Sequence, residues 1–477
     1  METINAEILK DIESACEQFR EMLIEQYERN RRIEVEALVT DGSTCDGSAY
    51  DGSLRSDNPC SDNPCSDKLC GGNSCGGSAD IENNRDKLII GLVPGDGIGP
   101  VIMDETRRIL EALLADELAS GLIEFKMVEG FTIERRFELG ETVPADVLEQ
   151  LLGCDVILKG PTTTPNAAMV AANGGKNLES ANVYLRKKLD LFANVRPVKL
   201  PEEGIDWTFF RENTEGEYAL GSKGIRIGDA LSMDFKVTTH GGTERIARAA
   251  YDYARSNGKK RVSIVTKANI MKKTDGDFQA ICLKIAEEYP EIKTDCWFVD
   301  IMAANLVNKD IRNQFEVFVL PNLYGDIITD EAAQIQGGVG TAGSANIGGK
   351  YSIFEAIHGS APRMVEEGIA HLANPASLLT ASVMMLRQLA VIAESQTLLQ
   401  MGLKQGSADT NDMEAAGGFG LDTNKSAGAS LASSLAEKAD LLEVAIASAD
   451  EELGSRMTGL PGGASCKDFA QLVVDKL

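Results

Sequence analysis

From Lys87 onward, short apolar runs alternate with longer amphipathic stretches, and this alternation constrains the fold most strongly. The strand-like runs are LIIGLV at 88–93, DVILKG at 155–160, RVSIVT at 261–266 and FEVFVLP at 315–321. Apolar runs of this length between helical segments are typical of α/β proteins, in which helices connect parallel strands. The sequence therefore predicts a parallel-rich sheet with flanking helices. Its length of 477 residues predicts roughly two to four domains.

The charge balance narrows the possible partners. Lys and Arg total 47 against 73 Asp and Glu, which gives a formal net charge of −26. Such a surface repels phosphate backbones and anionic lipid headgroups, so we expect no nucleic acid and no membrane as a main partner. No stretch approaches the ~18 uninterrupted apolar residues of a membrane helix, and the acidic start is unlike a signal or transit peptide. We expect a cytoplasmic protein.

Residues 1 to about 39 are predicted to form one helix. Apolar side chains recur there at alternating spacings of three and four residues: Leu9, Ile12, Cys16, Phe19 and Leu23. This spacing is typical of a helix that packs through one face. Because the stripe covers barely two heptads, it favours docking on the same protein over a coiled coil with a partner.

Residues 41–80 consist of five-residue repeats such as DGSAY, SDNPC and GGNSC, with almost no apolar residue to bury. This composition predicts a flexible linker. Cys60, Cys65, Cys70 and Cys75 recur at identical spacing, so a metal or redox site stays open as an alternative. The segment lacks the C-x-x-C pairs that are typical of zinc and iron–sulfur sites.

The other cysteines and a second low-complexity segment carry simpler expectations. Cys16, Cys154, Cys282 and Cys296 lie in apolar segments and are predicted to be ordinary buried thiols. Residues 404–430 are rich in Gly, Ala, Ser and Asp, which predicts a surface loop before a helix near 431–449.

A glycine-rich turn, PGDGIGP at 94–100, follows the first predicted strand and opens a helix. It resembles a dinucleotide-binding fingerprint only weakly, because no third glycine completes G-x-G-x-x-G. A tight strand-to-helix turn explains it equally well.

Three arginines stand out as candidates for binding a substrate with several carboxylates. Arg186 follows Ser180 and Asn182 in SANVYLR, and Arg196 and Arg211 come soon after. Guanidinium groups bind carboxylates through paired hydrogen bonds. In a chain this acidic the arginines could instead pair with surface acids, and spacing alone does not decide between the two.

Three aspartates suit a hard divalent cation. Asp326 and Asp330 lie four residues apart where a helix is predicted to begin, and Asp300 precedes them. Three carboxylates favour Mg²⁺ or Mn²⁺ over zinc, which prefers His or Cys. Acidic residues are also favoured in a first helical turn, so a capping role stays open.

A glycine-rich stretch from Gly337 to Gly349 leads to HGSAP at 358–362, with Asn374 beyond. Glycine lets a backbone approach a ligand closely, and a ring nitrogen or side-chain amide can bind the edge of an adenine. The candidate coenzyme-binding residues are therefore His358, Gly359, Ser360, Ala361 and Asn374.

Taken together, these segments resemble the isocitrate and isopropylmalate dehydrogenase family of β-decarboxylating dehydrogenases. The resemblance runs from about Leu88 to the C-terminus through eight motifs in the family's order: PGDGIGP, KGP, S-x-N-x-x-L-R, LFANVRP, RENTEGEY, KANIMK, NLYGDIITD and HGSAP. It implies that family's own α/β fold, with large and small domains around a central cleft. Because this is not a Rossmann fold, the turn at 95–99 is not interpreted as a pyrophosphate cradle.

The resemblance also implies a domain order. We expect an N-terminal helix at 1–40, a linker at 41–86, a large domain formed by 87–190 and 337–477, and a small domain with a dimer clasp at 191–336. Because the predicted site residues all lie from Ser180 onward, residues 1–86 are expected to be dispensable for chemistry.

The same resemblance implies roles for individual residues. Ser180, Asn182, Arg186, Arg196 and Arg211 would bind isocitrate, and Asp300, Asp326 and Asp330 would hold Mg²⁺ or Mn²⁺. Lys267 would take the proton of the substrate's C2 hydroxyl as hydride leaves for the nicotinamide, and Tyr218 would protonate the product. Lys267 and Asp300 would come from the neighbouring subunit, so a homodimer or larger assembly is expected.

Two alternatives and the choice of coenzyme stay open. Related enzymes act on isopropylmalate, homoisocitrate or tartrate, but Ser180 and Asn182 favour isocitrate. A non-catalytic regulatory subunit is the other alternative, although such subunits typically lose site residues. NAD is favoured over NADP because TGLPGG at 458–463 resembles the NAD branch, whereas Arg363 could accept a 2′-phosphate.

Overall fold

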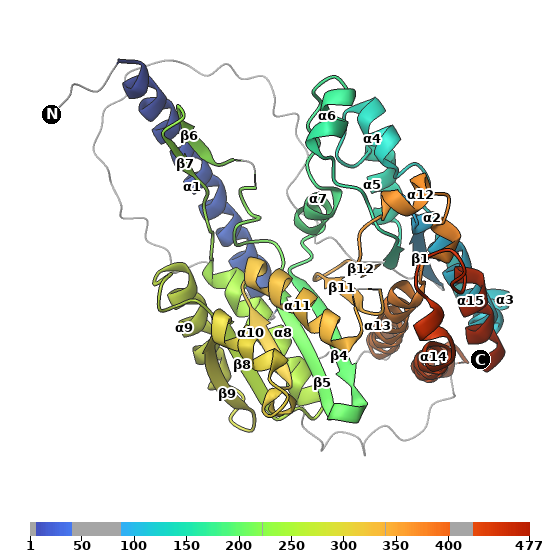
Figure 1. Cartoon of the computed structure of the whole chain (residues 1–477). Coiled ribbons are helices and arrows are strands. Elements are labelled where there is room, and N and C mark those ends of the chain that lie inside the picture. The colour runs from blue at the N-terminus through green and yellow to red at the C-terminus, as the bar shows by residue number, and fades with distance from the viewer. Residues whose placement is uncertain (1–5, 41–86, 222, 339, 401–422) are drawn as a thin grey trace, which may run out of the picture.

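The computed structural model describes residues 6–40, 87–221, 223–338, 340–400 and 423–477, and a ten-stranded mixed sheet runs through it (Figure 1). The strand order is β2-β1-β3-β12-β11-β4-β5-β10-β8-β9. In sequence order these strands are β1 (Leu88–Val93), β2 (Ile123–Met127), β3 (Val156–Lys159), β4 (Ala193–Leu200), β5 (Ile205–Glu212), β8 (Arg261–Thr266), β9 (Lys293–Phe298), β10 (Val317–Leu320), β11 (Gly343–Ile347) and β12 (Ser352–Ala356). A separate antiparallel hairpin pairs β6 (Ile225–Ile227) with β7 (Leu231–Met233).

The α/β prediction is confirmed. Strands β1 and β8 coincide with the predicted runs at 88–93 and 261–266, and β3 and β10 lie within the other two. Most neighbouring strands are parallel. The exceptions are at the middle of the sheet, where β11 pairs antiparallel with β12 and β4, and β4 pairs antiparallel with β5.

Helices cover the sheet, and their bounds follow the chain. They are α1 (Ala6–Thr40), α2 (Gly99–Leu113), α3 (Ala115–Ala119), α4 (Ile133–Leu139), α5 (Ala145–Leu152), α6 (Ala167–Ala172), α7 (Ala181–Lys188), α8 (His240–Ser256), α9 (Thr274–Ala286), α10 (Val299–Val307), α11 (Asn322–Gln336), α12 (Pro362–Glu366), α13 (Ala376–Gln400), α14 (Thr423–Leu453) and α15 (Cys466–Lys476).

Separate apolar cores lie in the two halves of the sheet. One core joins β1, β3 and β12 to α2, α13, α14 and α15. The cores of the other half join β5, β8 and β10 to α8, α9 and α10. Because the first core combines residues before 190 with residues after 340, it supports the expected division into 87–190, 191–336 and 337–477, which stays a prediction.

Helix α13 is the most apolar helix of the first core. Its residues 376–396 are long and apolar enough to cross a membrane, and 61% of the tested window is buried inside the molecule. Leu378, Leu379, Met385 and Leu386 are fully buried there. The apolar stretch is thus accounted for by packing in a protein core.

Helix α14 begins earlier than expected. It starts at Thr423, inside the segment predicted to be a loop up to residue 430. The alanines and the lysine of TNKSAGAS have helix propensities that a composition-based reading overlooks. The rest of the predicted insertion, 401–422, lies outside the described residues.

Helix α1 docks on its own chain, beside β6 and β7 and the start of α8 (Figure 1). The helix and its docking are confirmed, but the predicted contact face is wrong. Cys16 is exposed and Leu23 is 56% exposed, whereas Met22 and Ile33 are buried. Phe19 stacks on Phe235 from the helix edge. An apolar pattern could not identify this face, because polar contacts of Arg29 and Asn30 also set it.

The cysteine predictions divide in the same way. Cys154 and Cys282 are buried, as predicted, but Cys16 and Cys296 are exposed. Cys296 lies on β9, which forms one edge of the sheet. Cys60, Cys65, Cys70 and Cys75, with the rest of the predicted linker, lie outside the described residues.

Candidate active site

Three arginines from three different elements converge on one region. Arg186 comes from α7, Arg196 from β4 and Arg211 from β5, and their side chains are 13%, 7% and 1% exposed. Burial lowers the pKa of Arg211 to about 10, and the charges of Arg186 and Arg196 add to the effect. Burial likewise lowers the pKa of Arg196, which also feels the charge of Arg186. All three remain cationic at neutral pH, so the region attracts a polyanion.

Asp326 lies at the centre of this cluster. It forms a short ion pair with Nη1 of Arg211, and its Oδ1 lies 3.5 Å from Nη2 of Arg196. Burial alone would raise its pKa, but Arg211 and Arg196 outweigh burial, so the pKa lies below its usual value. Asp330, one helical turn later on α11, accepts a 2.8 Å hydrogen bond from Arg196. Both carboxylates therefore face the arginines, as their spacing predicted.

Tyr218 belongs to the same cluster. Its hydroxyl donates a 2.9 Å hydrogen bond to Oδ2 of Asp326, and the guanidinium of Arg211 lies 5.3 Å from its ring centre. Burial, followed by the charge of Asp326, raises the pKa of Tyr218. The phenol therefore keeps its proton at neutral pH.

Arg211 is held by α11 as well as by its own strand. Nε and Nη2 of Arg211 donate to Oδ1 of Asn322 at 3.0 and 2.6 Å. Gly325 leaves room for this approach, because a Cβ there would lie 2.5 Å from Cγ of Arg211. Asn322 was not predicted as a site residue, although it opens the NLYGDIITD motif that supplied Asp326.

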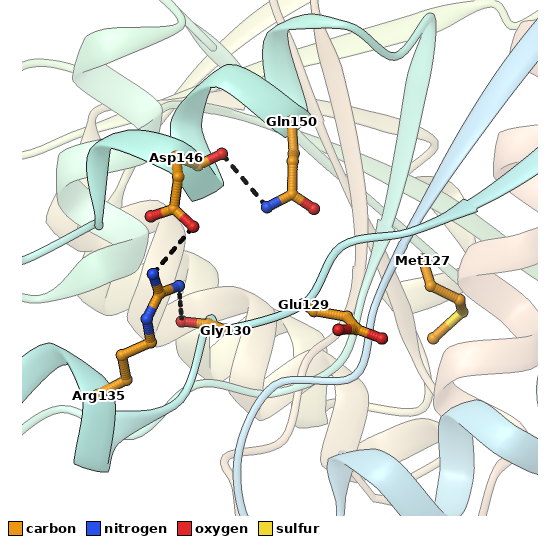
Figure 2. Close-up of a pocket in the computed structure, with 6 residues that line it drawn as sticks. All are labelled: Met127, Glu129, Gly130, Arg135, Asp146 and Gln150. Carbon is orange, nitrogen blue, oxygen red and sulfur yellow. Dashed lines mark hydrogen bonds and ion pairs between the residues drawn. The ribbon is translucent and has the colours of Figure 1, made fainter.

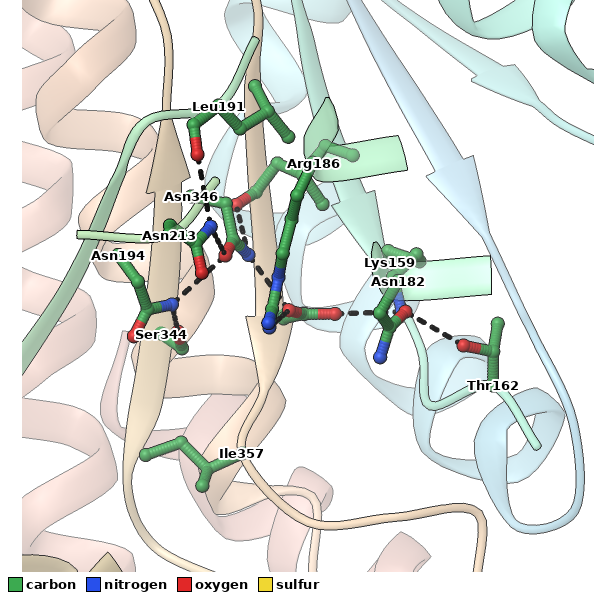
Figure 3. Close-up of polar contacts among 12 residues, drawn as sticks. Lys159, Thr162, Asn182, Arg186, Leu191, Asn194, Asn213, Ser344, Asn346 and Ile357 are labelled. Carbon is green, nitrogen blue, oxygen red and sulfur yellow. Dashed lines mark hydrogen bonds and ion pairs between the residues drawn. The ribbon is translucent and has the colours of Figure 1, made fainter. Parts of the chain in front are cut away.

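A buried polar network holds Arg186 (Figure 3). Glu355 lies 2.8 Å from Nζ of Lys159 and 3.4 Å from Nη2 of Arg186, and it accepts a 2.8 Å hydrogen bond from Asn346. Burial opposes the charge of Glu355, but Lys159 and Arg186 outweigh it and hold the pKa at about 2. The sequence reasoning missed Lys159 and Glu355. Their signal was the position of Lys159 in KGP and of Glu355 three residues before His358.

Ser180 and Asn182 face the loop that follows β3. Thr162 donates a 2.8 Å hydrogen bond to Oδ1 of Asn182, and the hydroxyls of Thr164 and Ser180 lie 3.4 Å apart. Asn182 also lines the same small cavity as Lys159 and Arg186. These two side chains therefore sit beside the arginine cluster through α7.

Lys267 and Asp300 form a separate pair. Their side chains form a short ion pair, and the backbone N–H of Lys267 donates a 2.7 Å hydrogen bond to the buried Asp275. Lys267 lowers the pKa of Asp300. Within the part of the chain that the structure describes, no three His, Cys, Asp or Glu side chains gather closely enough to hold a metal ion. One chain therefore brings Asp326 and Asp330 together but not Asp300.

The predicted coenzyme residues lie at the other end of the site. His358 follows β12, and burial lowers its pKa, so the ring is neutral at pH 7. Its Nδ1 lies 2.9 Å from the carbonyl of Gly359, while the buried Nε2 has no hydrogen-bond partner. Asn374 caps the start of α13, where its Oδ1 accepts from the N–H of Ala376. Ile357 and Ser377 hydrogen-bond at 3.2 Å and connect the two segments.

The turn at 94–100 packs directly against these segments. Gly95 and Gly97 have φ of 75° and 61°, and a Cβ on them would lie 2.2 Å from the carbonyl O of Pro161 and 1.9 Å from that of Ser360. Buried Asp96 accepts hydrogen bonds from the N–H groups of Ile133 and Thr163. The glycines thus allow close packing of three backbone segments, which agrees with the tight-turn interpretation.

We expect Gly97→Ala to destabilise the protein far more than Gly121→Ala. Both glycines have positive φ, but the structure has nothing within 4 Å of a Cβ at Gly121, whereas Ser360 blocks one at Gly97. The control therefore bears only the conformational cost of about 1 kcal/mol, and Gly97→Ala adds a backbone displacement of a few kcal/mol. Thermal unfolding of both variants measures the difference, and equal midpoints would contradict the packing argument.

A larger hollow lies away from all of these residues (Figure 2). It has a volume of about 520 Å³ and is lined by Met127, Glu129, Gly130, Arg135, Asp146 and Gln150. Arg135 pairs there with Asp146 at 2.9 Å. Because the hollow contains none of the predicted site residues, it is not the candidate active site.

Comparison with known proteins identifies relatives of the whole enzyme region. A model of the isocitrate/isopropylmalate dehydrogenase family matches residues 89–416. A mitochondrial isocitrate dehydrogenase [NAD] subunit 2 from Schizosaccharomyces pombe is 37% identical over 65% of this chain and 78% of its own length. An isocitrate dehydrogenase [NADP] from Rickettsia prowazekii is 39% identical over 62% of this chain and 59% of its own length.

Solved structures agree with the sequence comparisons. The crystal structure of isocitrate dehydrogenase from Methylococcus capsulatus has a TM-score of 0.61 and 30% identity, and the match covers 82% of this chain and 99% of that one. The relatives thus include both NAD and NADP enzymes. The chain belongs to the isocitrate/isopropylmalate dehydrogenase family.

Proposed function

We propose that this protein catalyses the oxidative decarboxylation of isocitrate to 2-oxoglutarate and CO₂, with Mg²⁺ or Mn²⁺ bound and NAD as the oxidant. The observation that carries the proposal is the convergence of three largely buried arginines on one region. Three like charges are kept together in a low-dielectric setting only where an anion compensates them. Isocitrate has three carboxylates, and relatives named isocitrate dehydrogenases support this choice.

The donor set fits a hard divalent cation. Asp326 and Asp330 are oxygen ligands on one face of α11, and the lowered pKa of Asp326 keeps it ionised. Asp300 of a neighbouring subunit would complete the set. A bound Mg²⁺ or Mn²⁺ would stabilise the negative charge that develops on the substrate oxygen at C2 as CO₂ leaves.

Two side chains would handle the protons. Lys267, from the neighbouring subunit, would take the proton of the C2 hydroxyl as hydride leaves C2 for the nicotinamide. Tyr218 would then deliver a proton to the carbon that has lost CO₂. The raised pKa of Tyr218 supports this role, because a proton donor must be protonated at neutral pH.

Rival substrates provide the test of this proposal. Isopropylmalate carries an apolar group where isocitrate carries a third carboxylate, and Ser180 and Asn182 offer hydrogen bonds to a carboxylate. We expect kcat/KM for isocitrate to exceed that for isopropylmalate, homoisocitrate and tartrate by at least about 100-fold, since buried polar groups reject an analogue that leaves them unpaired. A higher kcat/KM for any of the three would overturn the substrate assignment.

We expect NAD to be preferred over NADP by about tenfold or more in kcat/KM, or ~1.4 kcal/mol. The exposed Arg363, the residue that could accept a 2′-phosphate, already pairs with Glu367 at 2.6 Å. TGLPGG lies next to it, because a Cβ on Gly459 would lie 3.6 Å from Met364. Initial rates with each coenzyme measure the ratio, and a tenfold preference for NADP would reverse the assignment.

We also propose that the active unit is a homodimer or larger assembly. The supporting observation is that Lys267 and Asp300 pair with each other and not with the arginine cluster of their own chain. Apolar side chains are exposed around this pair, among them Ile270, Phe298 and Ile301, and a second copy would cover them.

A further inference from the structure

Arg29 of helix α1 reaches the segment that supplies Arg211 and Tyr218. Its Nη1 lies 2.8 Å from Oε1 of Glu215, and its Nη2 donates a 2.8 Å hydrogen bond to Oγ1 of Thr214. Glu215 and Thr214 belong to RENTEGEY, and both are buried. The contact therefore spans 186 residues of sequence and ends within four residues of the candidate substrate arginine.

A continuous chain of hydrogen bonds leads from Glu215 to Arg211. The backbone carbonyl of Glu215 accepts a 2.9 Å hydrogen bond from Nδ2 of Asn322. Oδ1 of Asn322 in turn accepts two hydrogen bonds from the guanidinium of Arg211. Asn322 can place this acceptor only where its own amide group is fixed, so the position of Glu215 bears directly on the position of Arg211.

Buried negative charge explains why a cation is needed at this place. Glu212 and Glu215 are each 2% exposed. Burial and the charge of Glu215 raise the pKa of Glu212 to about 7, and Arg29 counteracts this shift. The remaining partners of Glu215 are the N–H and hydroxyl of Thr239 at the start of α8, which are neutral donors.

We propose that Arg29 is a positioning residue that holds the Arg211–Tyr218 segment in its substrate-binding arrangement. This inference rests on the proposed function, since it assigns Arg211 to isocitrate. It also opposes the expectation that residues 1–86 are dispensable for chemistry. Arg211 would bind a carboxylate throughout the reaction, so loss of Arg29 should weaken substrate binding more than it slows turnover.

The experiment compares three variants of the full-length chain with the wild type. Arg29→Met removes the charge and both hydrogen bonds. Arg29→Lys keeps the charge toward Glu215 but cannot donate to Thr214 at the same time. Glu25→Gln is the matched control, because it removes another ion pair of α1, the exposed pair with Lys223 at 2.7 Å, that does not reach the network.

We expect Arg29→Met to raise KM for isocitrate about tenfold with kcat within about threefold of wild type, while Arg29→Lys recovers part of the loss and Glu25→Gln has no effect. A merely structural role would lower the thermal midpoint and the active fraction without moving KM. An unchanged KM in Arg29→Met or a KM raised equally in Arg29→Lys would overturn the inference. A wild-type chain that does not turn over isocitrate would instead overturn the proposed function.

Discussion

Asp326→Asn should lower kcat/KM for isocitrate at least about 100-fold, or ~2.7 kcal/mol, with part of the loss recovered at high Mn²⁺. The substitution removes a charged oxygen ligand and leaves Arg211, Arg196 and Tyr218 without the carboxylate that they share. Initial rates over a series of Mg²⁺ and Mn²⁺ concentrations measure both effects.

The matched control for this substitution is Asp440→Asn. Asp440 is an exposed aspartate of α14 that pairs with Arg387, and exposed ion pairs contribute little. Its variant should keep wild-type kinetics. An Asp326→Asn enzyme with unchanged kcat and metal dependence would show that Asp326 does not hold the cation.

Mixing inactive Lys267→Met chains with inactive Asp326→Asn chains should restore activity. In a mixed dimer, the intact Lys267 of one chain meets the intact Asp326 of the other at one of the two sites. Random pairing makes about half of the dimers mixed, so about a quarter of wild-type activity is expected. Differently tagged chains allow the mixed dimers to be isolated and assayed.

A second mixture provides the control for shared sites. Lys267 and Asp300 would enter the same neighbouring site together, so Lys267→Met mixed with Asp300→Asn leaves every site broken. No activity should return in that mixture. Recovery in both mixtures, or in neither, would contradict a site that is divided as proposed.

The sequence was a good guide wherever a pattern depends on local periodicity or a short motif. Strands β1 and β8 coincide with their apolar runs, and the spacing of Asp326 and Asp330 placed both carboxylates on one helix face. The three arginines were correctly grouped, because their neighbours in sequence carry the family's motifs. In each case the information lies within a few residues of the side chain concerned.

Contacts across the chain were out of reach. Glu355 could not be recognised as the partner of Lys159 and Arg186, because β12 meets β3 only in the folded sheet. The docked face of α1 was misjudged because Arg29 binds Glu215, a partner 186 residues away. Periodicity records which side chains are apolar, and it does not record which buried charge needs compensation.

The most direct test of the account is turnover by the purified full-length chain with isocitrate, Mg²⁺ and NAD. The account predicts that 2-oxoglutarate, CO₂ and reduced coenzyme form in equal amounts, and that a chelator of divalent cations stops the reaction. Binding of isocitrate without turnover, under conditions where the protein is folded and assembled, would contradict it and favour a regulatory subunit.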